Sequence, residues 1–171
     1  MKILFLGASG SGKSTQGQIL AEEKGFVWLS SGQMFRESGD PEILEILKGA
    51  QLVPDELTGK MMIEAIENQG RDNFILDGFP RNLRQCEILT ENGIELDKIV
   101  EIDVPKEELV KRVVLRGREQ DKEEILLERV EMYEKTRDLI VDYFVKRGAD
   151  FVKVDGVGEI EEVAKRVKEV F

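Results

Sequence analysis

Short apolar runs alternate with longer stretches of helical periodicity along this chain. The runs are rich in Ile, Val, Leu and Phe, which is typical of strands buried on both faces, and they lie at 2–6, 27–30, 73–77, 98–103 and 151–155. The stretches between them have helical spacing, so the pattern predicts an α/β fold. We expect three layers, with a five-stranded, mostly parallel sheet flanked by helices.

Two of the intervening stretches give more detail. A turn at 37–41 precedes a short predicted helix at 42–48, and a long helix is predicted from about 122 to 146. The long helix carries an apolar stripe that should face the core, formed by Ile125, Leu126, Val130, Tyr133 and Leu139.

A glycine-rich loop separates the first apolar run from a helix-forming stretch. Residues 7–14 match the phosphate-loop pattern G-x-x-x-x-G-K-[ST] at every fixed position, which predicts a P-loop NTPase fold that binds ATP or a similar triphosphate. Glycines let successive backbone N–H groups point at an anion, and the helix beginning near Gly12 adds its positive dipole end. Lys13 should reach the β- and γ-phosphates, and the Ser14 hydroxyl should face Mg²⁺. The candidate triphosphate-binding residues are Gly7, Ala8, Ser9, Gly10, Ser11, Gly12, Lys13, Ser14 and Thr15.

The third apolar run ends in a carboxylate that is followed by polar residues. Asp77 stands where phosphate-loop proteins place an acidic side chain near magnesium or its waters. Arg81 should lie at the same edge of the sheet. If Asn82 opens a helix, Gln85 falls in the first turn of that helix.

Several arginines fall near the same predicted edge. Arg36 follows the second apolar run, Arg112 and Arg116 share a helix face, Arg118 follows, and Arg129 lies on the next helix. Taken alone, Arg36 fits a solvated surface position, and the helical arginines fit salt bridges with neighbouring glutamates. Beside a phosphate loop they also fit phosphoryl transfer, in which arginines stabilise the charge on the moving group.

Composition restricts the possible partners. The net charge is −10, which argues against broad contact with nucleic acid and favours a small anion bound at a local cluster of arginines. One cysteine and no histidine exclude an internal disulfide and make a structural zinc site a poor fit. No signal segment is recognised, and no apolar run approaches the roughly 18 residues that span a bilayer, so a cytoplasmic protein without a membrane partner is expected.

Together these stretches resemble an adenylate kinase of the nucleoside monophosphate kinase family over nearly the whole chain. The matching parts are 7–16, 31–36, 51–56, 76–81 with Gln85, 103–105, the arginines of 112–129, and 154–156. The resemblance implies a phosphotransferase that reversibly transfers the terminal phosphoryl group of MgATP to AMP, giving two ADP.

The resemblance also implies roles for individual residues. The catalytic set would be Lys13, Arg81, Arg116, Arg118 and Arg129. Beyond the phosphate loop, ATP would contact Arg112 and Gly158, and Mg²⁺ would be held by Ser14 and Asp77, partly through water. AMP would contact Ser31, Gly32, Arg36, Gln51, Leu52, Val53, Gly78, Phe79, Arg81 and Gln85. The Gln85 amide would read the acceptor base, because an amide can both accept from the adenine amino group and donate to a ring nitrogen.

The chain departs from the family pattern in two segments of its expected single domain, 1–171. The AMP-binding insertion, at about 31–60, is short, and the lid is reduced to about 116–121. Lids exclude water, so their loss should raise ATP hydrolysis or require cover from a neighbouring subunit of a homo-oligomer. Two alternatives stay open: a UMP/CMP kinase, whose relatives typically carry asparagine at the position of Gln85, and a nucleotide-binding module or slow ATPase without transferase activity.

Overall fold

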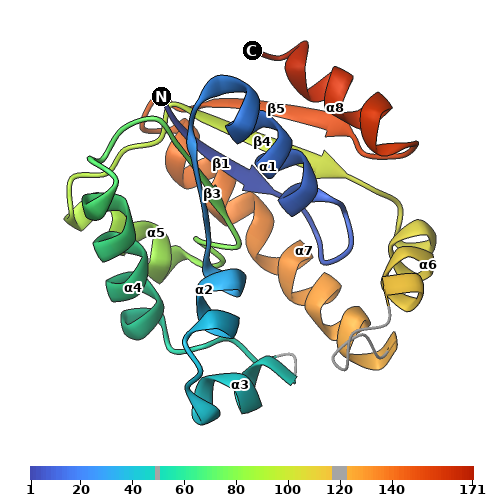
Figure 1. The fold of residues 1–171 in the computed structure, drawn as a ribbon, viewed down its shortest axis with the longest axis horizontal. Coiled ribbons are helices and arrows are strands. Elements are labelled where there is room, and N and C mark those ends of the chain that lie inside the picture. Colours follow the sequence, from blue (N-terminus) through green and yellow to red (C-terminus); the bar gives the residue numbers. More distant parts are fainter. Residues whose placement is uncertain (49–50, 117–122) are drawn as a thin grey trace.

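The computed structural model describes residues 1–48, 51–116 and 123–171 and is built around one parallel sheet (Figure 1). The strands in this described part are β1 (Lys2–Leu6), β2 (Val27–Ser30), β3 (Phe74–Asp77), β4 (Lys98–Asp103) and β5 (Asp150–Asp155). Their order is β2-β3-β1-β4-β5, and every neighbouring pair is parallel. The predicted sheet is confirmed, with one-residue shifts at the starts of β3 and β5.

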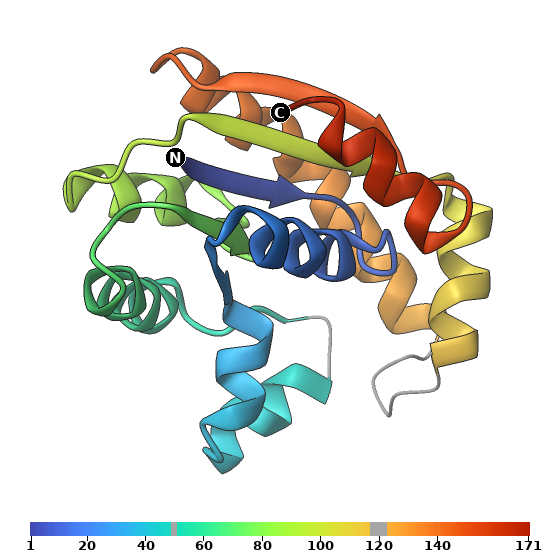
Figure 2. The same ribbon diagram turned by 45° about the horizontal axis from the view of Figure 1, so that its top comes forward.

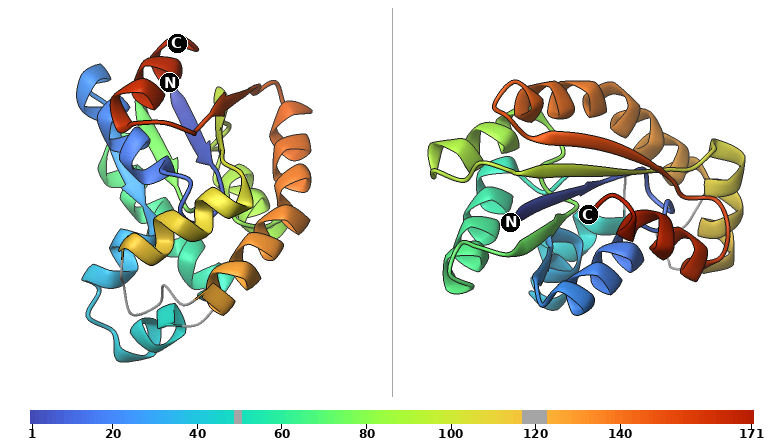
Figure 3. Two further views of the ribbon diagram at one scale, coloured as in Figure 1. Left: turned by 90° about the vertical axis from the view of Figure 1, so that its right-hand side faces the viewer. Right: turned by 90° about the horizontal axis from the view of Figure 1, so that it is seen from above.

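Helices cover both faces of this sheet (Figure 3). They are α1 (Lys13–Lys24), α2 (Ser31–Glu37), α3 (Pro41–Lys48), α4 (Asp55–Asn68), α5 (Leu83–Glu91), α6 (Lys106–Arg116), α7 (Glu123–Val145) and α8 (Ile160–Lys168). This arrangement confirms the predicted three layers. None of the helices in the described ranges is both long and apolar enough to cross a lipid bilayer.

Strand β1 shows how the sheet divides the core. Ile3 and Phe5 pack into a cluster with side chains of α1, α6 and α8, whereas Leu4 and Leu6 pack with side chains of α4, α5 and the C-terminal half of α7. Successive side chains of a strand point to opposite faces, so a continuous apolar run fills both cores. β1 is therefore fixed at the centre of the molecule, and the loop that follows it starts from a rigid base.

Helices α2 and α3 project from one end of the sheet (Figure 2). They have a small core of their own, formed by Phe35 and Ile43 together with Val53 from the segment before α4. The predicted short helix at 42–48 is observed as α3, and its Ile43 side chain is 5% exposed. This insertion forms one wall of the cavity described below.

The apolar stripe expected along the long helix is only partly correct. Leu126 and Val130 are buried as predicted, but Leu139 is 49% exposed, and Ile140 and Phe144 are buried instead. The helix turns by about 100° per residue, so a one-residue error moves a side chain off the buried face.

Candidate active site

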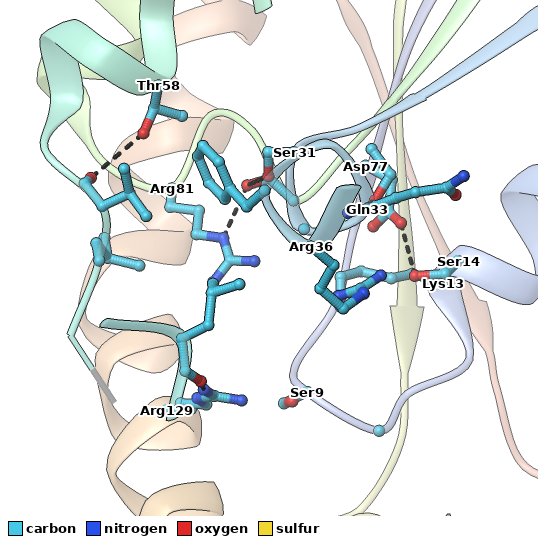
Figure 4. A pocket seen from close by; sticks show the side chains of 18 of the residues that line it. Ser9, Lys13, Ser14, Ser31, Gln33, Arg36, Thr58, Asp77, Arg81 and Arg129 are labelled. Atoms are coloured by element: carbon cyan, nitrogen blue, oxygen red, sulfur yellow. Dashed lines mark hydrogen bonds between the residues drawn. The ribbon is translucent and has the colours of Figure 1, made fainter. Parts of the chain in front are cut away.

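A cavity of about 510 Å³ lies at the carboxyl ends of β1, β2 and β3, beside the N-terminus of α1 (Figure 4). Its walls come from the glycine-rich loop, α2, the segment before α4, the end of β3, α6 and α7. It gathers most of the residues predicted from the sequence: Ser9, Gly10, Gly12, Lys13, Ser14, Thr15, Ser31, Gly32, Arg36, Gln51, Leu52, Val53, Asp77, Gly78, Arg81, Gln85, Arg112 and Arg129.

The charge of the cavity is opposite to that of the whole protein. Among the lining residues that the structure describes, one is a carboxylate, Asp77, and five are cationic, namely Lys13, Arg36, Arg81, Arg112 and Arg129. The chain as a whole carries a net charge of −10. A concave surface of one sign concentrates ligands of the other sign, so the cavity is built for a strongly anionic ligand.

The glycine-rich loop has the backbone geometry of an anion cradle. Gly12, the N-cap of α1, has a φ of 91°, and Lys13 is the first residue of the helix. At Gly7 a Cβ atom would lie 2.9 Å from the Ile102 carbonyl oxygen, so a side chain there would collide with the end of β4. The Lys13 ammonium lies 3.5 Å from the Ala8 carbonyl oxygen, close to the loop. Backbone N–H groups, the helix dipole and Lys13 therefore face the same space.

A hydroxyl and a carboxylate meet beside this loop. Ser14 Oγ donates a hydrogen bond to Asp77 Oδ2 at 2.6 Å, and Asp77 is 2% exposed at the end of β3. These oxygen donors suit Mg²⁺, which prefers oxygen ligands and is commonly bound by one or two protein groups together with substrate phosphates and water. The two residues predicted to hold Mg²⁺ therefore lie next to each other, and their groups fit the ion.

Opposite the loop, two side chains converge on the carbonyl oxygen of Gly78. Arg81 Nε donates to it at 2.7 Å, and Ser31 Oγ donates to it at 2.8 Å. Desolvation in the cavity lowers the pKa of Arg81, and the nearby Asp77 carboxylate opposes this shift. Because the residue is exposed to the open cavity and arginine starts from a very high pKa, its guanidinium stays charged. Arg36, from α2, also lines this side and is exposed.

Gln85 also lines the cavity and is 1% exposed. Asn82 opens α5, because its side chain accepts a hydrogen bond from the Gln85 backbone N–H at 2.9 Å, so the condition for placing Gln85 in the first turn is met. The Gln85 side chain accepts from the Arg81 backbone N–H and donates to Asp55, both at 2.7 Å. Its amide therefore lines the cavity in a fixed position.

Arginines from α6 and α7 complete the cavity. Arg112 donates to the carbonyl oxygen of Gly156 at 3.0 Å and to that of Ser11 at 3.5 Å, so it links the glycine-rich loop to the segment after β5. Arg129 Nη2 donates to the Leu47 carbonyl oxygen at 2.9 Å, which joins α7 to the end of α3. Figure 4 shows Arg36, Arg81 and Arg129 around the cavity; they come from α2, from the segment between β3 and α5, and from α7.

Some predicted residues do not line this cavity. Gly7 lines a smaller neighbouring cavity, Ala8 and Ser11 are buried in the loop, the Phe79 side chain is 0% exposed in the core, and Gly158 lies in an exposed segment before α8. At Phe79 only the backbone remains a candidate for ligand contact. Arg118, the proposed lid and the Arg116 side chain lie outside the described part of the molecule, so these predictions stay predictions.

The structure also adds residues that the sequence did not indicate. Trp28, Thr58 and Val113 line the cavity, and Asp55 binds Gln85. Trp28 is the single tryptophan of the chain and lies two residues before the end of β2, a position that could have marked it as a cavity residue. Asp55 begins a helix directly after a proline, where an acidic residue is ordinarily explained by the helix dipole alone.

Comparisons with known proteins agree with this geometry. The family model for adenylate kinase matches residues 5–149. The adenylate kinases of Thermus thermophilus and Thermobifida fusca are both 38% identical to this chain, over 97% of it and over 94% and 95% of their own lengths. That of Mycolicibacterium vanbaalenii is 37% identical over 97% of this chain and 96% of its own. Since these matches span nearly the whole chain and include the phosphate loop and the cavity around it, the protein belongs to the adenylate kinase family and is a phosphotransferase.

Proposed function

We propose that this adenylate kinase binds ATP and AMP at opposite sides of the cationic cavity and transfers the terminal phosphoryl group between them, giving two ADP. The observation that carries this proposal is the arrangement of the cavity. A phosphate loop forms one side, Arg36, Arg81 and Gln85 form the other, and all of them line a single space. A simple ATPase has no need for the second side.

ATP would occupy the side formed by the glycine-rich loop. The N-terminus of α1 and Lys13 would hold its β- and γ-phosphates. Arg112 would stack on the adenine, near the segment from Gly156 to Gly158 to which its guanidinium is already bound. Ser14 and Asp77 would hold Mg²⁺, partly through water; when bound, the ion neutralises charge on the phosphate oxygens.

AMP would occupy the opposite side. Arg36 and Arg81 would bind its phosphate, since a guanidinium can form paired hydrogen bonds to phosphate oxygens. Ser31 and Gly32 together with the backbone of Gln51, Leu52 and Val53 would line the nucleoside pocket, and Gln85 would contact the base.

Transfer in this arrangement needs alignment and charge stabilisation more than proton transfer. The acceptor is already an anionic phosphate oxygen, so no side chain has to act as a general base. Lys13, Arg81 and Arg129 line one cavity from separate parts of the chain, where they would stabilise the charge on the moving phosphoryl group. We propose the same role for Arg116 and Arg118.

Closure and setting are part of the proposal. We propose a single domain over 1–171, with an AMP-binding insertion at about 31–60 and a minimal lid at about 116–121. A neighbouring subunit would then help to exclude water, and analytical ultracentrifugation tests this: a monomer with full transferase activity would rule out the subunit contact. A cytoplasmic protein with small anionic partners, rather than nucleic acid or membrane, agrees with its composition.

The decisive experiment measures ADP formation from MgATP with AMP, CMP or UMP, beside a control without acceptor. Fast ADP formation with AMP alone is the expected result. Preference for CMP or UMP would indicate a pyrimidine nucleotide kinase. ADP release at the same rate without any acceptor would indicate an ATPase and would contradict the proposal.

A further inference from the structure

The amide of Gln85 is held at both ends by groups of opposite character. Its Nε2 donates to Asp55 Oδ1 at 2.7 Å, and its Oε1 accepts from the backbone N–H of Arg81 at 2.7 Å. A carboxylate oxygen can only accept, and a backbone N–H can only donate. The two contacts therefore favour the same orientation of the amide, and each contributes to holding it.

Rotation of this amide by 180° would lose both contacts. The NH₂ group would then face the Arg81 N–H, and the amide oxygen would face the Asp55 carboxylate, so like groups would meet in a place where Gln85 is 1% exposed. Buried polar groups without partners are strongly disfavoured. Asp55 is in turn fixed by Asn82, whose Nδ2 donates to the same Oδ1 atom at 2.9 Å.

A fixed amide presents its donor and acceptor in one order only. A 6-aminopurine offers an amino donor at C6 and an acceptor at N1, whereas a 6-oxopurine offers an oxygen acceptor at C6 and an N–H donor at N1. A freely rotating glutamine could match either base by turning over. A glutamine held in one orientation can match one of them, and it opposes donor to donor and acceptor to acceptor with the other.

We propose that Asp55 is a specificity-determining residue, which holds the Gln85 amide in one orientation and so selects a 6-aminopurine monophosphate over a 6-oxopurine monophosphate. The inference rests on the proposed role of Gln85 at the acceptor base. Asp55 acts through Gln85 and is thus a positioning residue. It comes from α4, thirty residues before Gln85 in the sequence.

The test compares AMP with IMP, the matching 6-oxopurine nucleotide, as acceptors for MgATP. In Asp55→Ala the ratio of kcat/KM for AMP to that for IMP should fall at least tenfold, because one of the two contacts that orient the amide is gone. Asp55→Asn should keep most of the preference, since its amide oxygen can still accept from Gln85 and Asn82. Glu56→Ala is the matched control, because this neighbouring carboxylate binds Arg84 on the surface and does not touch Gln85.

Two further measurements separate the possible failures. Binding of AMP and IMP without turnover, followed by the fluorescence of Trp28 in the cavity wall, should show the same change in preference, and melting curves should show that each variant is folded. If Gln85→Ala lowers the preference for AMP and Asp55→Ala does not, the role of Asp55 is overturned while the base contact stands. If Gln85→Ala leaves the preference unchanged, the proposed base contact itself fails. A loss in Asp55→Asn as large as that in Asp55→Ala would also overturn the inference, because an accepting oxygen would then not be sufficient.

Discussion

At the scale of single residues, the main feature is a set of cations held in an acidic protein. Four of the five cavity cations contact backbone carbonyl oxygens: Lys13 contacts Ala8, Arg81 contacts Gly78, Arg112 contacts Gly156, and Arg129 contacts Leu47. Such contacts hold the positive charges in place before any ligand binds. Preorganised charge is effective in catalysis because little reorganisation is needed during the reaction.

Removing one of these charges should affect the reaction far more than the fold. We expect Lys13→Ala and Arg81→Ala each to lower kcat by about 10²–10³-fold, the usual effect of deleting one group that stabilises transition-state charge. Melting temperatures should change little, because both side chains face the cavity. The measurement is steady-state ADP formation with AMP as acceptor.

Arg84→Ala is the matched control for these two variants. Arg84 lies on α5 and binds Glu56, Glu87 and Glu91 on the surface, away from the cavity. Its removal should leave kcat within about twofold of the wild type, since surface ion pairs contribute little. Wild-type turnover in Lys13→Ala or Arg81→Ala would contradict the assignment of these residues.

At the scale of secondary-structure elements, α7 is joined to the sheet by a buried polar cluster. Glu101, on β4, is 3% exposed, accepts a hydrogen bond from the Tyr133 hydroxyl at 2.6 Å and forms two hydrogen bonds with Arg137. Burial, and then the bond to Glu101, raise the pKa of Tyr133, so its hydroxyl stays protonated and donates. Tyr133 lies one turn from Arg129 on α7. We therefore expect this cluster to fix the position of Arg129 relative to the sheet.

Tyr133→Phe should therefore reduce both stability and activity. A hydrogen bond to a charged acceptor contributes about 1.5–3 kcal/mol, so the free energy of unfolding should fall by roughly that amount in urea titrations. kcat should fall as well, because α7 loses one of its contacts to β4 close to Arg129, and the position of that arginine becomes less well defined.

Tyr143→Phe provides the control, since it lies near the C-terminal end of the same helix. The chain has two tyrosines, and the hydroxyl of Tyr143 bonds to the neutral hydroxyl of Thr90 on α5 at 2.8 Å. This variant should lose only about 1 kcal/mol and keep its kcat. Equal effects of the two substitutions on kcat would show that the Glu101 cluster does not position Arg129.

The same cluster explains why the sequence pattern predicts the buried face of the long helix only in part. Its buried face runs through Val130, Tyr133, Arg137, Ile140 and Phe144, at alternating steps of three and four residues. The arginine at the centre of that face interrupts the apolar pattern. Without it the apolar spacing favours Leu139 as the core residue. The partner that makes Arg137 acceptable there is on another element, so no local pattern could reveal it.

At the scale of the whole molecule, Cys86 reports on the integrity of the fold. It is 0% exposed in the core formed by the sheet with α4, α5 and α7. Burial, with a smaller contribution from the charge of Glu87, raises the pKa of its thiol from 9.0 to about 12. The reactive thiolate is therefore scarce in the folded protein near neutral pH.

Two outcomes are expected from this thiol. Iodoacetamide should not modify the native protein at pH 8, and it should modify the protein over the same urea range as global unfolding. The folded state also holds the thiol proton to higher pH than the unfolded state. Stability should thus fall as the pH rises from about 9 to about 12, and less so in Cys86→Ala, as measured by urea titrations at several pH values. Rapid labelling of the native protein would contradict the buried position.

The sequence by itself determined the α/β alternation, the phosphate loop at the end of β1, and the helix opened by Asn82. These features follow from local causes, because burial on both faces, tight glycine turns and N-capping act within a few residues. Only the tertiary structure decided that Asp55 binds the Gln85 amide, that Arg129 donates a hydrogen bond to the Leu47 carbonyl oxygen, and that Glu101 accepts hydrogen bonds from Arg137. Each of these contacts joins segments distant in sequence, and its partners are fixed by how helices pack on the sheet. For that reason the sequence could name the chemistry of the site, while the packing determined the orientation of its side chains.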